Sequence, residues 1–412
     1  MRYGLLGEKL GHSFSKEIHN MLGDYSYDLT EVTRSDFDDF IERRDFIALN
    51  VTIPYKEMVI PYLDYIDDSA KAIGAVNTIV NKDGRLYGYN TDFFGMERLI
   101  AHARIGIKGR RVAILGTGGT SKTARAVVKS LGAREIIIVS RSEKDGAISY
   151  DRLYSDHKNV EVIINTTPAG MFPNTDASPL DLSKFEKLFG VIDAVYNPLR
   201  TALVVEAKKR GIRATGGLYM LVAQAVRASE IFLDTRYDGK IISKIYRKLM
   251  RKKENIVLIG MPASGKSTVG KILEKKLKRK AFDTDKLIER KEKASIPSIF
   301  AEKGENYFRD AESLTIKEIS DKNGIIIATG GGSVLREENV DNLKRNGRLY
   351  FIDRPLTKLI PTSNRPLAKS PADIEKRYNE RYGIYSAAAD VRIDANTSAP
   401  MTADKILKDY ES

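Results

Sequence analysis

The sequence contains neither cysteine nor tryptophan among its 412 residues, and it contains only four histidines. The lack of cysteine excludes disulfides, thiolate zinc sites, iron–sulfur clusters and thiol nucleophiles, and it fits a reducing compartment. No apolar run reaches the roughly 18 residues that a membrane-spanning helix needs. Charged residues already appear at Glu8 and Lys9, which is not typical of a signal peptide. We therefore expect a cytoplasmic protein that has no membrane partner.

Acidic residues are also comparatively few. The sequence has 55 aspartates and glutamates against 68 lysines and arginines, which gives a net charge of +13. Such an excess favours anionic ligands, although most surface charges simply contact water. Six basic residues fall between Lys244 and Lys253, interleaved with apolar residues at helical spacing, which indicates an amphipathic helix with a solvated face. The aromatic–basic pattern of RNA-binding modules is absent. We expect no nucleic-acid partner and keep binding by this helix as a rival hypothesis.

The length predicts two to three domains, at roughly 100–200 residues each. Two glycine-rich loops follow apolar runs that begin at Arg111 and Asn255, and their different glycine spacings indicate two unlike nucleotide-binding loops. The basic helix at 241–253 separates them. Further apolar runs lie at 135–140, 160–165, 191–195, 324–329, 348–353 and 390–394. Their alternation with helical patterns predicts an α/β fold with parallel sheets that helices cover on both faces.

The first loop has the setting of a dinucleotide-binding loop, because it follows an apolar run and opens a helical pattern. Gly116 permits a tight turn, and Gly118 lets the backbone approach a pyrophosphate at the helix N-terminus. The expected cofactor contacts are Gly116, Thr117, Gly118, Gly119, Thr120 and Ser121. The next apolar run ends at Ser140 and Arg141, where an NAD site would place a carboxylate. A guanidinium and hydroxyls suit a 2′-phosphate, so we predict NADP(H).

Five short polar segments outside this loop carry a family resemblance. They are Gly11–Ser15 (GHSFS), Asn50–Lys56 (NVTIPYK), Gly74–Thr78 (GAVNT), Asn90–Asp92 (NTD) and Gly216–Gln224 (GGLYMLVAQ). Hydroxyls, amides, one lysine and one aspartate suit a small polyhydroxylated acid. In this order the segments resemble the motifs of shikimate dehydrogenase, and the resemblance covers residues 1–240.

The resemblance implies an enzyme in two parts. An α/β substrate-binding subdomain would take residues 1–103 and 214–240, and a Rossmann-like subdomain would bind NADP with residues 104–213. The enzyme would reduce 3-dehydroshikimate to shikimate, and the alkoxide formed from the ketone would need a proton donor. Lys56 and Asp92 would be the catalytic pair, with the ammonium as the proton donor.

Other residues acquire roles from the same resemblance. Ser13 and Ser15 would hold the substrate carboxylate, although serines before a helical run could instead cap a helix. The remaining substrate contacts would be Thr52, Asn77, Asp92, Tyr196 and Gln224, with Gly217 against the cofactor. Tyr219 occupies a position that often holds glycine in the family, close to the expected nicotinamide.

The second loop matches the phosphate-binding pattern GxxxxGK[ST] between an apolar run and a helical pattern. Its backbone N–H groups would wrap phosphates, Lys266 would reach the β- and γ-oxygens, and Ser267 would ligate Mg²⁺. The expected nucleotide contacts are Gly260, Ala263, Ser264, Gly265, Lys266, Ser267 and Thr268. The pattern predicts a bound nucleotide and leaves kinase, GTPase and ATPase open.

Downstream segments narrow this choice. They are Phe282–Asp285 (FDTD), Phe308–Asp310 (FRD), Gly330–Gly332 (GGG), Arg365–Leu367 (RPL) and Arg381 four residues before Tyr385. Two carboxylates, a glycine triplet and three arginines suit an acceptor that is both an acid and an alcohol. Over residues 254–412 the segments resemble shikimate kinase, which implies a domain of the P-loop nucleoside monophosphate kinase type that phosphorylates shikimate with MgATP.

This second resemblance assigns the parts of a phosphoryl-transfer site. Asp283 would organise Mg²⁺ through water, and Asp285 would orient the attacking hydroxyl. Arg309 and Arg381 would pair with the substrate carboxylate. Arg365 would lie on a mobile lid and stabilise charge on the transferred phosphoryl group. The substrate contacts would be Asp285, Arg309, Gly330, Gly331, Gly332 and Arg381.

The two halves fit consecutive steps, so we predict a bifunctional enzyme of the shikimate pathway with a helical linker at 241–253 and a kinase domain at 254–412. Two alternatives stay open. The dehydrogenase half could prefer quinate. The kinase half, whose lid between Asp353 and Arg365 is shorter than usual in the family, could be a degraded binding or regulatory module. The sequence also leaves a homo-oligomer open.

Overall fold

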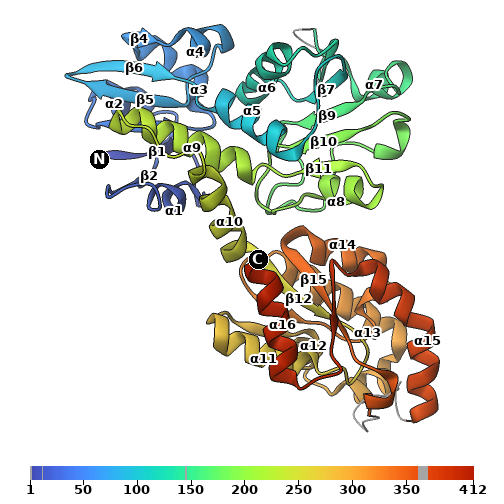
Figure 1. Ribbon diagram of the computed structural model, residues 1–412. Coiled ribbons are helices and arrows are strands. Elements are labelled where there is room, and N and C mark those ends of the chain that lie inside the picture. The colour runs from blue at the N-terminus through green and yellow to red at the C-terminus, as the bar shows by residue number, and fades with distance from the viewer. Residues whose placement is uncertain (1, 12, 144–145, 361–369) are drawn as a thin grey trace. The chain divides into compact units, whose positions relative to one another are not determined.

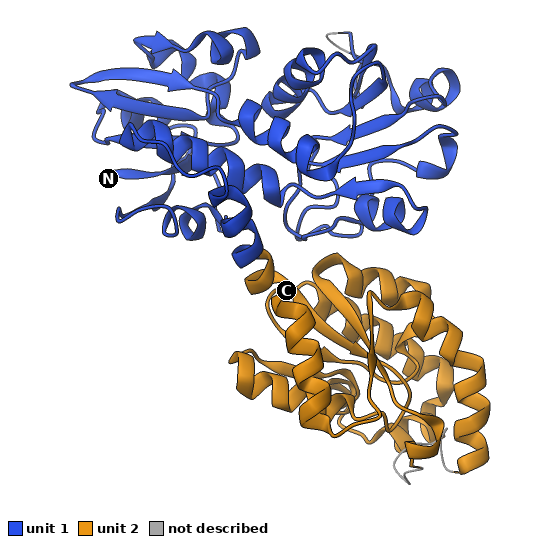
Figure 2. Ribbon diagram, viewed as in Figure 1, with its two compact units in different colours: residues 1–249 blue, residues 250–412 orange. Residues whose placement is uncertain are grey.

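The computed structural model describes residues 2–11, 13–143, 146–360 and 370–412. It divides into two compact units, unit 1 (Met1–Leu249) and unit 2 (Met250–Ser412), which Figure 2 colours separately. Mostly parallel sheets form the centre of both units, so the predicted α/β fold class is confirmed (Figure 1). Within the described ranges, no helix combines the length and the apolar character that crossing a bilayer requires.

Unit 1 begins with a six-stranded sheet in the order β2-β1-β3-β5-β6-β4. Its strands are β1 (Tyr3–Gly7), β2 (Asp28–Glu31), β3 (Ala48–Val51), β4 (Tyr65–Ile66), β5 (Thr78–Lys82) and β6 (Arg85–Tyr89). β1 runs parallel to β2 and β3, whereas β5 runs antiparallel to β3 and β6. The carboxyl ends of β1, β3 and β6 therefore lie at the same edge as the amino end of β5.

Short helices cover this first sheet. They are α1 (Ser15–His19), α2 (Phe37–Glu42), α3 (Tyr55–Met58) and α4 (Asp68–Ile73), with a 3₁₀ turn η1 (Ile60–Tyr62). Leu6, Leu49 and Ile79 of the strands are fully buried in one core with residues of α2, α3 and α4. α1 and α3 are the first helices after β1 and β3, so their first turns lie at the edge where the carboxyl ends of the strands meet.

The second sheet of unit 1 has five parallel strands in the order β11-β10-β9-β7-β8. They are β7 (Arg111–Leu115), β8 (Glu135–Val139), β9 (Val162–Asn165), β10 (Gly190–Asp193) and β11 (Arg213–Thr215). The helices beside them are α5 (Asp92–Ala103), α6 (Gly119–Ser130), α7 (Tyr150–Asp156), η2 (Leu182–Lys184) and α8 (Ala202–Lys209). Alternate residues of β7 enter two cores, since Ile114 packs with α5 and α6 whereas Leu115 packs with α7 and α8. Helices therefore cover both faces, as predicted.

Helix α9 (Leu218–Leu233) connects the two sheets of unit 1 (Figure 1). Met220 near its start joins the core of α5 and the second sheet. Ala228 and Phe232 near its end pack with Leu5 and Val80 of the first sheet. After β11 the chain thus returns to the first sheet.

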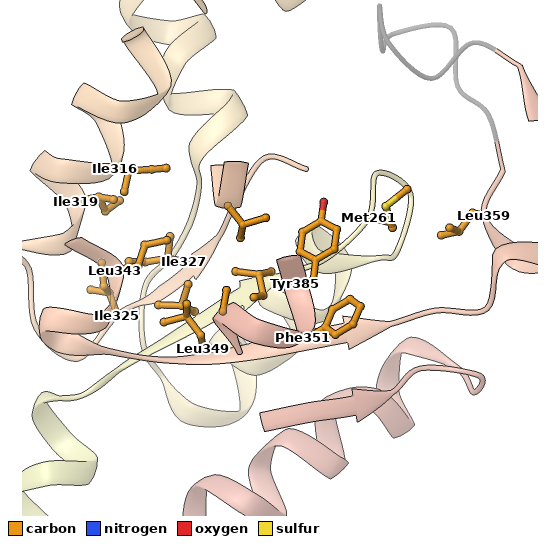
Figure 3. Close-up of a cluster of buried hydrophobic side chains, with 14 of the residues drawn as sticks. Met261, Ile316, Ile319, Ile325, Ile327, Leu343, Leu349, Phe351, Leu359 and Tyr385 are labelled. Carbon is orange, nitrogen blue, oxygen red and sulfur yellow. The ribbon is translucent and has the colours of Figure 1, made fainter. Parts of the chain in front are cut away.

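Unit 2 is built on five parallel strands in the order β13-β14-β12-β15-β16. They are β12 (Asn255–Ile259), β13 (Ala281–Asp283), β14 (Ile326–Ala328), β15 (Gly347–Asp353) and β16 (Val391–Asp394). Its helices are α11 (Lys266–Leu277), α12 (Thr284–Glu292), α13 (Ile296–Ser320), η3 (Ser333–Leu335), α14 (Glu337–Asn346), η4 (Leu356–Lys358), α15 (Pro371–Ala388) and α16 (Ala399–Glu411). One face buries Val257 and Phe351 with Tyr385 (Figure 3), and the other buries Ile256 and Tyr350.

The basic, amphipathic segment forms helix α10 (Ile241–Lys253), and its first half packs on unit 1. The hydroxyls of Tyr219 and Ser243 lie 3.3 Å apart. The ring of Tyr219 stacks on His102 with centroids 4.0 Å apart, and Tyr246 meets both rings edge-on. The Tyr219 side chain therefore lies in an aromatic cluster with α5 and α10, a neighbourhood that its place in the family motif did not suggest. Burial and the nearby charge of Arg104 lower the pKa of His102, which favours the neutral imidazole in this cluster.

A fragment of unit 1 that ends at Lys253 should be more stable than one that ends at Lys240, because only the longer one keeps Tyr246 in the aromatic cluster. We expect the melting temperature of the shorter fragment to be lower by about 5 °C or more, because it also lacks the buried side chains of Ile242, Ile245 and Leu249. The longer fragment with Tyr246→Ala should fall between the two. Equal melting temperatures in calorimetry for all three would contradict the packing of α10 on unit 1.

Candidate active sites

The two serines predicted to hold a carboxylate lie at the start of α1, with Ser13 two residues before its first residue, Ser15. Ser15 is the first helical residue and is buried, while the N-cap residue, Phe14, makes no side-chain capping bond. The backbone N–H of Ser15 donates to Ser13 Oγ at 3.2 Å. The structure therefore assigns no capping role to the Ser15 side chain, and it holds the two serines together in one turn.

Tyr196 reaches the same turn from the second sheet of unit 1. It follows β10, its ring lies 5.3 Å from that of Phe14, and its hydroxyl hydrogen-bonds with Ser13. Burial raises the pKa of Tyr196, while the bond to Ser13 acts in the opposite direction. Three predicted substrate contacts, Ser13, Ser15 and Tyr196, thus come together.

Lys56 and Asp92 form a buried ion pair at the shared edge of the first sheet. Lys56 lies in α3 after β3, and Asp92 is the first residue of α5 after β6. Lys56 Nζ is 2.5 Å from Asp92 Oδ2, and only 14% and 8% of these side chains are exposed. A charge-assisted hydrogen bond of this kind fixes the ammonium in one position. The pair could therefore exchange a proton with a ligand at a defined place.

Amide and hydroxyl groups continue the same edge. Asn77 Oδ1 accepts the Thr91 backbone N–H at 2.7 Å, and the Thr91 hydroxyl donates to Gln224 Oε1 at 3.4 Å. Asn50 Nδ2 donates to the Thr78 hydroxyl at 3.1 Å. Asn77 and Gln224, which are predicted substrate contacts, are thus connected through Thr91. Thr52, another predicted contact, is half-buried directly after β3.

The predicted cofactor loop adjoins the Lys56–Asp92 pair. A Cβ atom at Gly119 would lie 3.7 Å from the Lys56 side chain. Lys122 in the first turns of α6 forms an ion pair with Glu57, the neighbour of Lys56, with 2.8 Å between Nζ and Oε2. The N-terminus of α6 therefore opens beside the proton donor predicted for the substrate.

The backbone of this loop suits an anion at the start of α6. Gly116 has a φ of 105°, which favours glycine, and a Cβ there would come within 2.9 Å of the Thr166 hydroxyl. Ser121 stands where the fingerprint has its third glycine, and its hydroxyl donates to the Gly116 carbonyl at 2.7 Å. No atom would lie within 4 Å of a Cβ at Gly118, the N-cap of α6. Thr117 is exposed and Thr120 is half-buried in the same loop.

Ser140 and Arg141 follow β8, the strand that pairs with β7. Ser140 is half-buried and Arg141 is exposed. Gly217, also predicted to contact the cofactor, begins a different helix, α9. As the N-cap of α9 it approaches the Ala194 carbonyl so closely that a Cβ would lie 2.1 Å from that oxygen. Close backbone packing thus explains the glycine at position 217.

A buried carboxylate, Asp193, joins two loops at the edge of the second sheet. Its Oδ1 accepts from Asn165 Nδ2 and the Val195 N–H at 3.0 Å each, and its Oδ2 lies 2.6 Å from the Thr201 hydroxyl. Burial raises the pKa of Asp193 to about 7 despite these bonds. Asn165 Oδ1 in turn accepts from the backbone and the hydroxyl of Thr167. Asp193 therefore holds the loops after β9 and β10 in place. β9 pairs with β7, the strand that precedes the predicted cofactor loop.

In unit 2, the phosphate loop connects β12 to α11. Lys266 is 7% exposed and donates from Nζ to the carbonyls of Gly260 and Met261 at 2.7 and 2.8 Å. Gly265 has a φ of 93°, and Ala263 has a φ of 64° although it is not a glycine. The other predicted contacts of this loop and the first turn of α11 are Ser264, Ser267 and Thr268. The loop curls its backbone around the start of a helix, which suits phosphate oxygens.

Ser267 and Asp283 meet beside this loop. Ser267 Oγ donates to Asp283 Oδ2 at 2.5 Å, and Asp283 also caps α12 by accepting the Lys286 N–H at 3.3 Å. Mg²⁺ is usually bound by one or two carboxylates together with phosphates, so this donor set fits the ion. Among the described residues, this site included, no cluster of three or more histidines, aspartates and glutamates is arranged to hold a metal.

The glycine triplet (Gly330–Gly332) follows β14 and is surrounded by charged groups. A Cβ at Gly330 would lie 2.5 Å from Asp285 Oδ1, and one at Gly332 would lie 2.0 Å from Arg309 Nη1. Arg381 Nη1 donates to the carbonyl of Gly331 at 3.1 Å. The structure thus gathers the predicted acceptor-binding residues, while Arg365 lies outside the described residues.

The two arginines have different electrostatic surroundings. Burial acts to lower the pKa of Arg309, but Glu312 and Glu305 outweigh it and raise the pKa. Glu312 is 1% exposed at its side chain and accepts from Arg309 Nη1 at 2.8 Å. Burial lowers the pKa of Arg381. A bound carboxylate would therefore compensate the charge of Arg381 most directly.

Sequence patterns missed several residues that build these sites. Asn50 and Thr91 lie inside the NVTIPYK and NTD segments and could have been selected there. Glu312 could have been found from its spacing, because it lies three residues after Arg309 on one helix. Asp193 ends an apolar strand, which is a weaker signal.

The fold and the sites define an α/β enzyme that joins a dinucleotide-dependent oxidoreductase unit to a P-loop kinase unit. The family model of the shikimate dehydrogenase substrate binding domain matches residues 5–79. The family model of shikimate kinase matches residues 262–411.

Known proteins extend these matches. The shikimate dehydrogenase (NADP(+)) of Clostridium perfringens is 40% identical over 265 residues, which are 60% of this chain and 97% of that protein. The crystal structure of shikimate dehydrogenase 1 from Peptoclostridium difficile is 38% identical, covers 60% of this chain and 98% of its own, and has a TM-score of 0.57. A chorismate mutase/shikimate 5-dehydrogenase fusion protein from Clostridium acetobutylicum is 37% identical over 60% of this chain and 96% of its own, with a TM-score of 0.56.

The chain therefore belongs to the shikimate dehydrogenase family, and residues 262–411 form a shikimate kinase domain. It is a bifunctional enzyme of the shikimate pathway, as both sequence resemblances predict.

Asp193→Asn should alter the pH dependence of stability. The pKa of Asp193 rises from 3.8 to about 7 on folding, so the folded protein keeps a proton that the unfolded chain releases. The free energy of unfolding of unit 1 should then decrease as the pH rises between these values, by up to about 1.4 kcal/mol per pH unit. Asparagine mimics the neutral acid and should remove this slope. Calorimetry between roughly pH 5 and 8 checks the expectation, and an unchanged slope in the variant would refute it.

Proposed function

We propose that the enzyme reduces 3-dehydroshikimate to shikimate with NADPH and then phosphorylates shikimate at its 3-hydroxyl with MgATP. The observation that carries the proposal is the buried Lys56–Asp92 pair beside the N-terminus of α6. Arg309 and Arg381 at the glycine triplet support the second step, because both could meet one carboxylate. An acidic alcohol suits both sites.

In unit 1 the chain's own residues would bind the substrate and move one proton. NADP(H), when bound, supplies the hydride for the ketone carbon. Lys56 Nζ would give its proton to the developing alkoxide oxygen, while Asp92 holds the ammonium in place. The Ser13–Ser15 turn and Tyr196 would hold the carboxylate at the other end of the ring. The amide groups around Thr91 would bind the hydroxyls.

In unit 2 the residues would position an acceptor against a nucleotide. MgATP, when bound, supplies the phosphoryl group. Ser267 would ligate Mg²⁺, and Asp283 would hold the ion through water. Lys266 would exchange its carbonyl partners for phosphate oxygens. Asp285 would bind the acceptor hydroxyl at the triplet, with the arginines on the carboxylate. Positioning and charge compensation are the main contributions that a protein makes to phosphoryl transfer.

The proposed domains follow the sites. Residues 1–103 and 214–240 would bind the substrate of the dehydrogenase, and residues 104–213 would bind NADP. Residues 254–412 would be the kinase, joined through α10 (Ile241–Lys253). The name of the Clostridium perfringens relative specifies NADP(+), which supports the choice of cofactor.

Two single substitutions in the full chain should separate the activities. Lys56→Ala should lower NADPH-linked reduction by roughly 10²–10⁴-fold, the usual contribution of a general acid, and should leave phosphorylation of shikimate intact. Lys266→Ala should do the reverse, because it removes the cation of the phosphate loop. Both activities are assayed on each protein. The exposed lysines Lys71 and Lys271 provide alanine controls that should keep both activities. A joint loss in either test variant would contradict independent sites.

Arg141→Ala should weaken the preference for NADPH. If its guanidinium pairs with the 2′-phosphate, the KM for NADPH should rise roughly 10–100-fold, while the KM for NADH changes little. Arg152→Ala is a suitable control, because Arg152 lies in α7 and pairs with Asp156 across one helical turn. Equal effects on the two cofactors would show that Arg141 does not read the 2′-phosphate.

A further inference from the structure

One carbonyl oxygen in unit 2 accepts two donors from the same helix. The Gly331 carbonyl accepts from Arg381 Nη1 at 3.1 Å and also from the Tyr385 hydroxyl. Arg381 and Tyr385 are four residues apart on α15, so they lie on one face of it. Both are buried, with 6% and 0% of the residue exposed.

The Gly331 peptide lies between two other parts of the site. A Cβ at Gly331 would be 2.7 Å from Pro262 Cγ in the phosphate loop. The next residue, Gly332, is pressed against the guanidinium of Arg309. A group that fixes this peptide therefore also fixes Arg381 relative to Arg309 and to the phosphate loop.

Arg381 needs a second anchor to keep its orientation. A guanidinium carries five N–H donors, and one bond to a carbonyl leaves it able to swing when an anion arrives. The Tyr385 hydroxyl donates to the same carbonyl and also hydrogen-bonds with Arg381. Burial raises the pKa of Tyr385 to about 12, so the hydroxyl keeps its proton at neutral pH.

We propose that Tyr385 is a positioning residue for the carboxylate of the phosphoryl acceptor. By holding the Gly331 carbonyl, its hydroxyl orients Arg381 so that the remaining N–H groups of the guanidinium face the same anion as Arg309. This role rests on the proposed kinase function. Tyr385 then acts on the binding of the acidic end of the acceptor, and neither on ATP nor on the transferred phosphoryl group.

The same helix offers a matched control. Tyr382 also packs on Phe351, with ring centroids 5.6 Å apart, and its hydroxyl donates to Asp353 Oδ2 at 3.1 Å. The ring of Tyr385 stacks on Phe351 at 5.2 Å, and Figure 3 shows its hydroxyl pointing away from that ring. Phenylalanine at either position keeps the ring in the core and removes one hydroxyl. Of the two tyrosine hydroxyls, that of Tyr385 bonds the glycine triplet and that of Tyr382 bonds Asp353.

The test compares Tyr385→Phe and Tyr382→Phe in the full chain by steady-state kinetics. For Tyr385→Phe we expect the KM for shikimate to rise roughly tenfold, with kcat and the KM for ATP within about twofold of the wild type, because a misplaced Arg381 binds the carboxylate more weakly in the ground state and the transition state alike. Tyr382→Phe should leave all three constants near wild type. An unchanged kcat for phosphorylation reports that unit 2 of each variant is folded, and the dehydrogenase activity reports the same for unit 1.

A double-substitution cycle with Arg381→Lys separates positioning from general stability. If Tyr385 acts through Arg381, the effects on the KM for shikimate should be clearly less than additive. Additive effects, an unchanged KM in Tyr385→Phe, or an equal rise in the KM for ATP would overturn the proposal. A wild-type chain without shikimate-dependent turnover of ATP would instead refute the kinase function, and this role with it.

Discussion

In each unit, nearly all of the proposed site residues lie at or just after the ends of strands that meet at one edge of a sheet. In unit 1, Lys56 follows β3 and Asp92 follows β6, and the antiparallel β5 brings its own start to the same edge. In unit 2, the phosphate loop follows β12, Asp283 ends β13 and the glycine triplet follows β14. These three strands are neighbours in the order β13-β14-β12. The strands themselves only position the site, so they can be almost purely apolar. The residues proposed to bind ligands lie in the loops and first helical turns that follow them.

The same edges are buried, and several of the charges there are compensated by partners within the chain. Lys56 is paired with Asp92, and Arg309 is paired with Glu312. Asp193 is compensated by protonation and by hydrogen bonds instead. An uncompensated charge in such surroundings would cost several kcal/mol. The pairs are therefore needed for stability, and they also hold the functional groups in fixed positions.

The sequence predicted the α/β class and the apolar strands well, because continuous apolar runs leave few other folds. It also selected Lys56, Asp92 and Arg309, since motif order and residue chemistry agree at these positions. It could not reveal that Tyr196 meets Ser13, because that contact joins two sheets and depends on how they pack. The stacking of Tyr219 on His102 likewise depends on how α9 packs against α5. The role assigned to Arg365 stays a prediction.

The central claim is that shikimate leaves unit 1 as product and serves unit 2 as phosphoryl acceptor. The most direct measurement gives the full chain 3-dehydroshikimate, NADPH and MgATP and follows the organic products by mass spectrometry. Shikimate should appear first and a monophosphorylated product second, and leaving out MgATP should stop the sequence at shikimate. Phosphorylated product in the absence of NADPH, or oxidation of NADPH without any phosphorylated product in the complete mixture, would contradict the account.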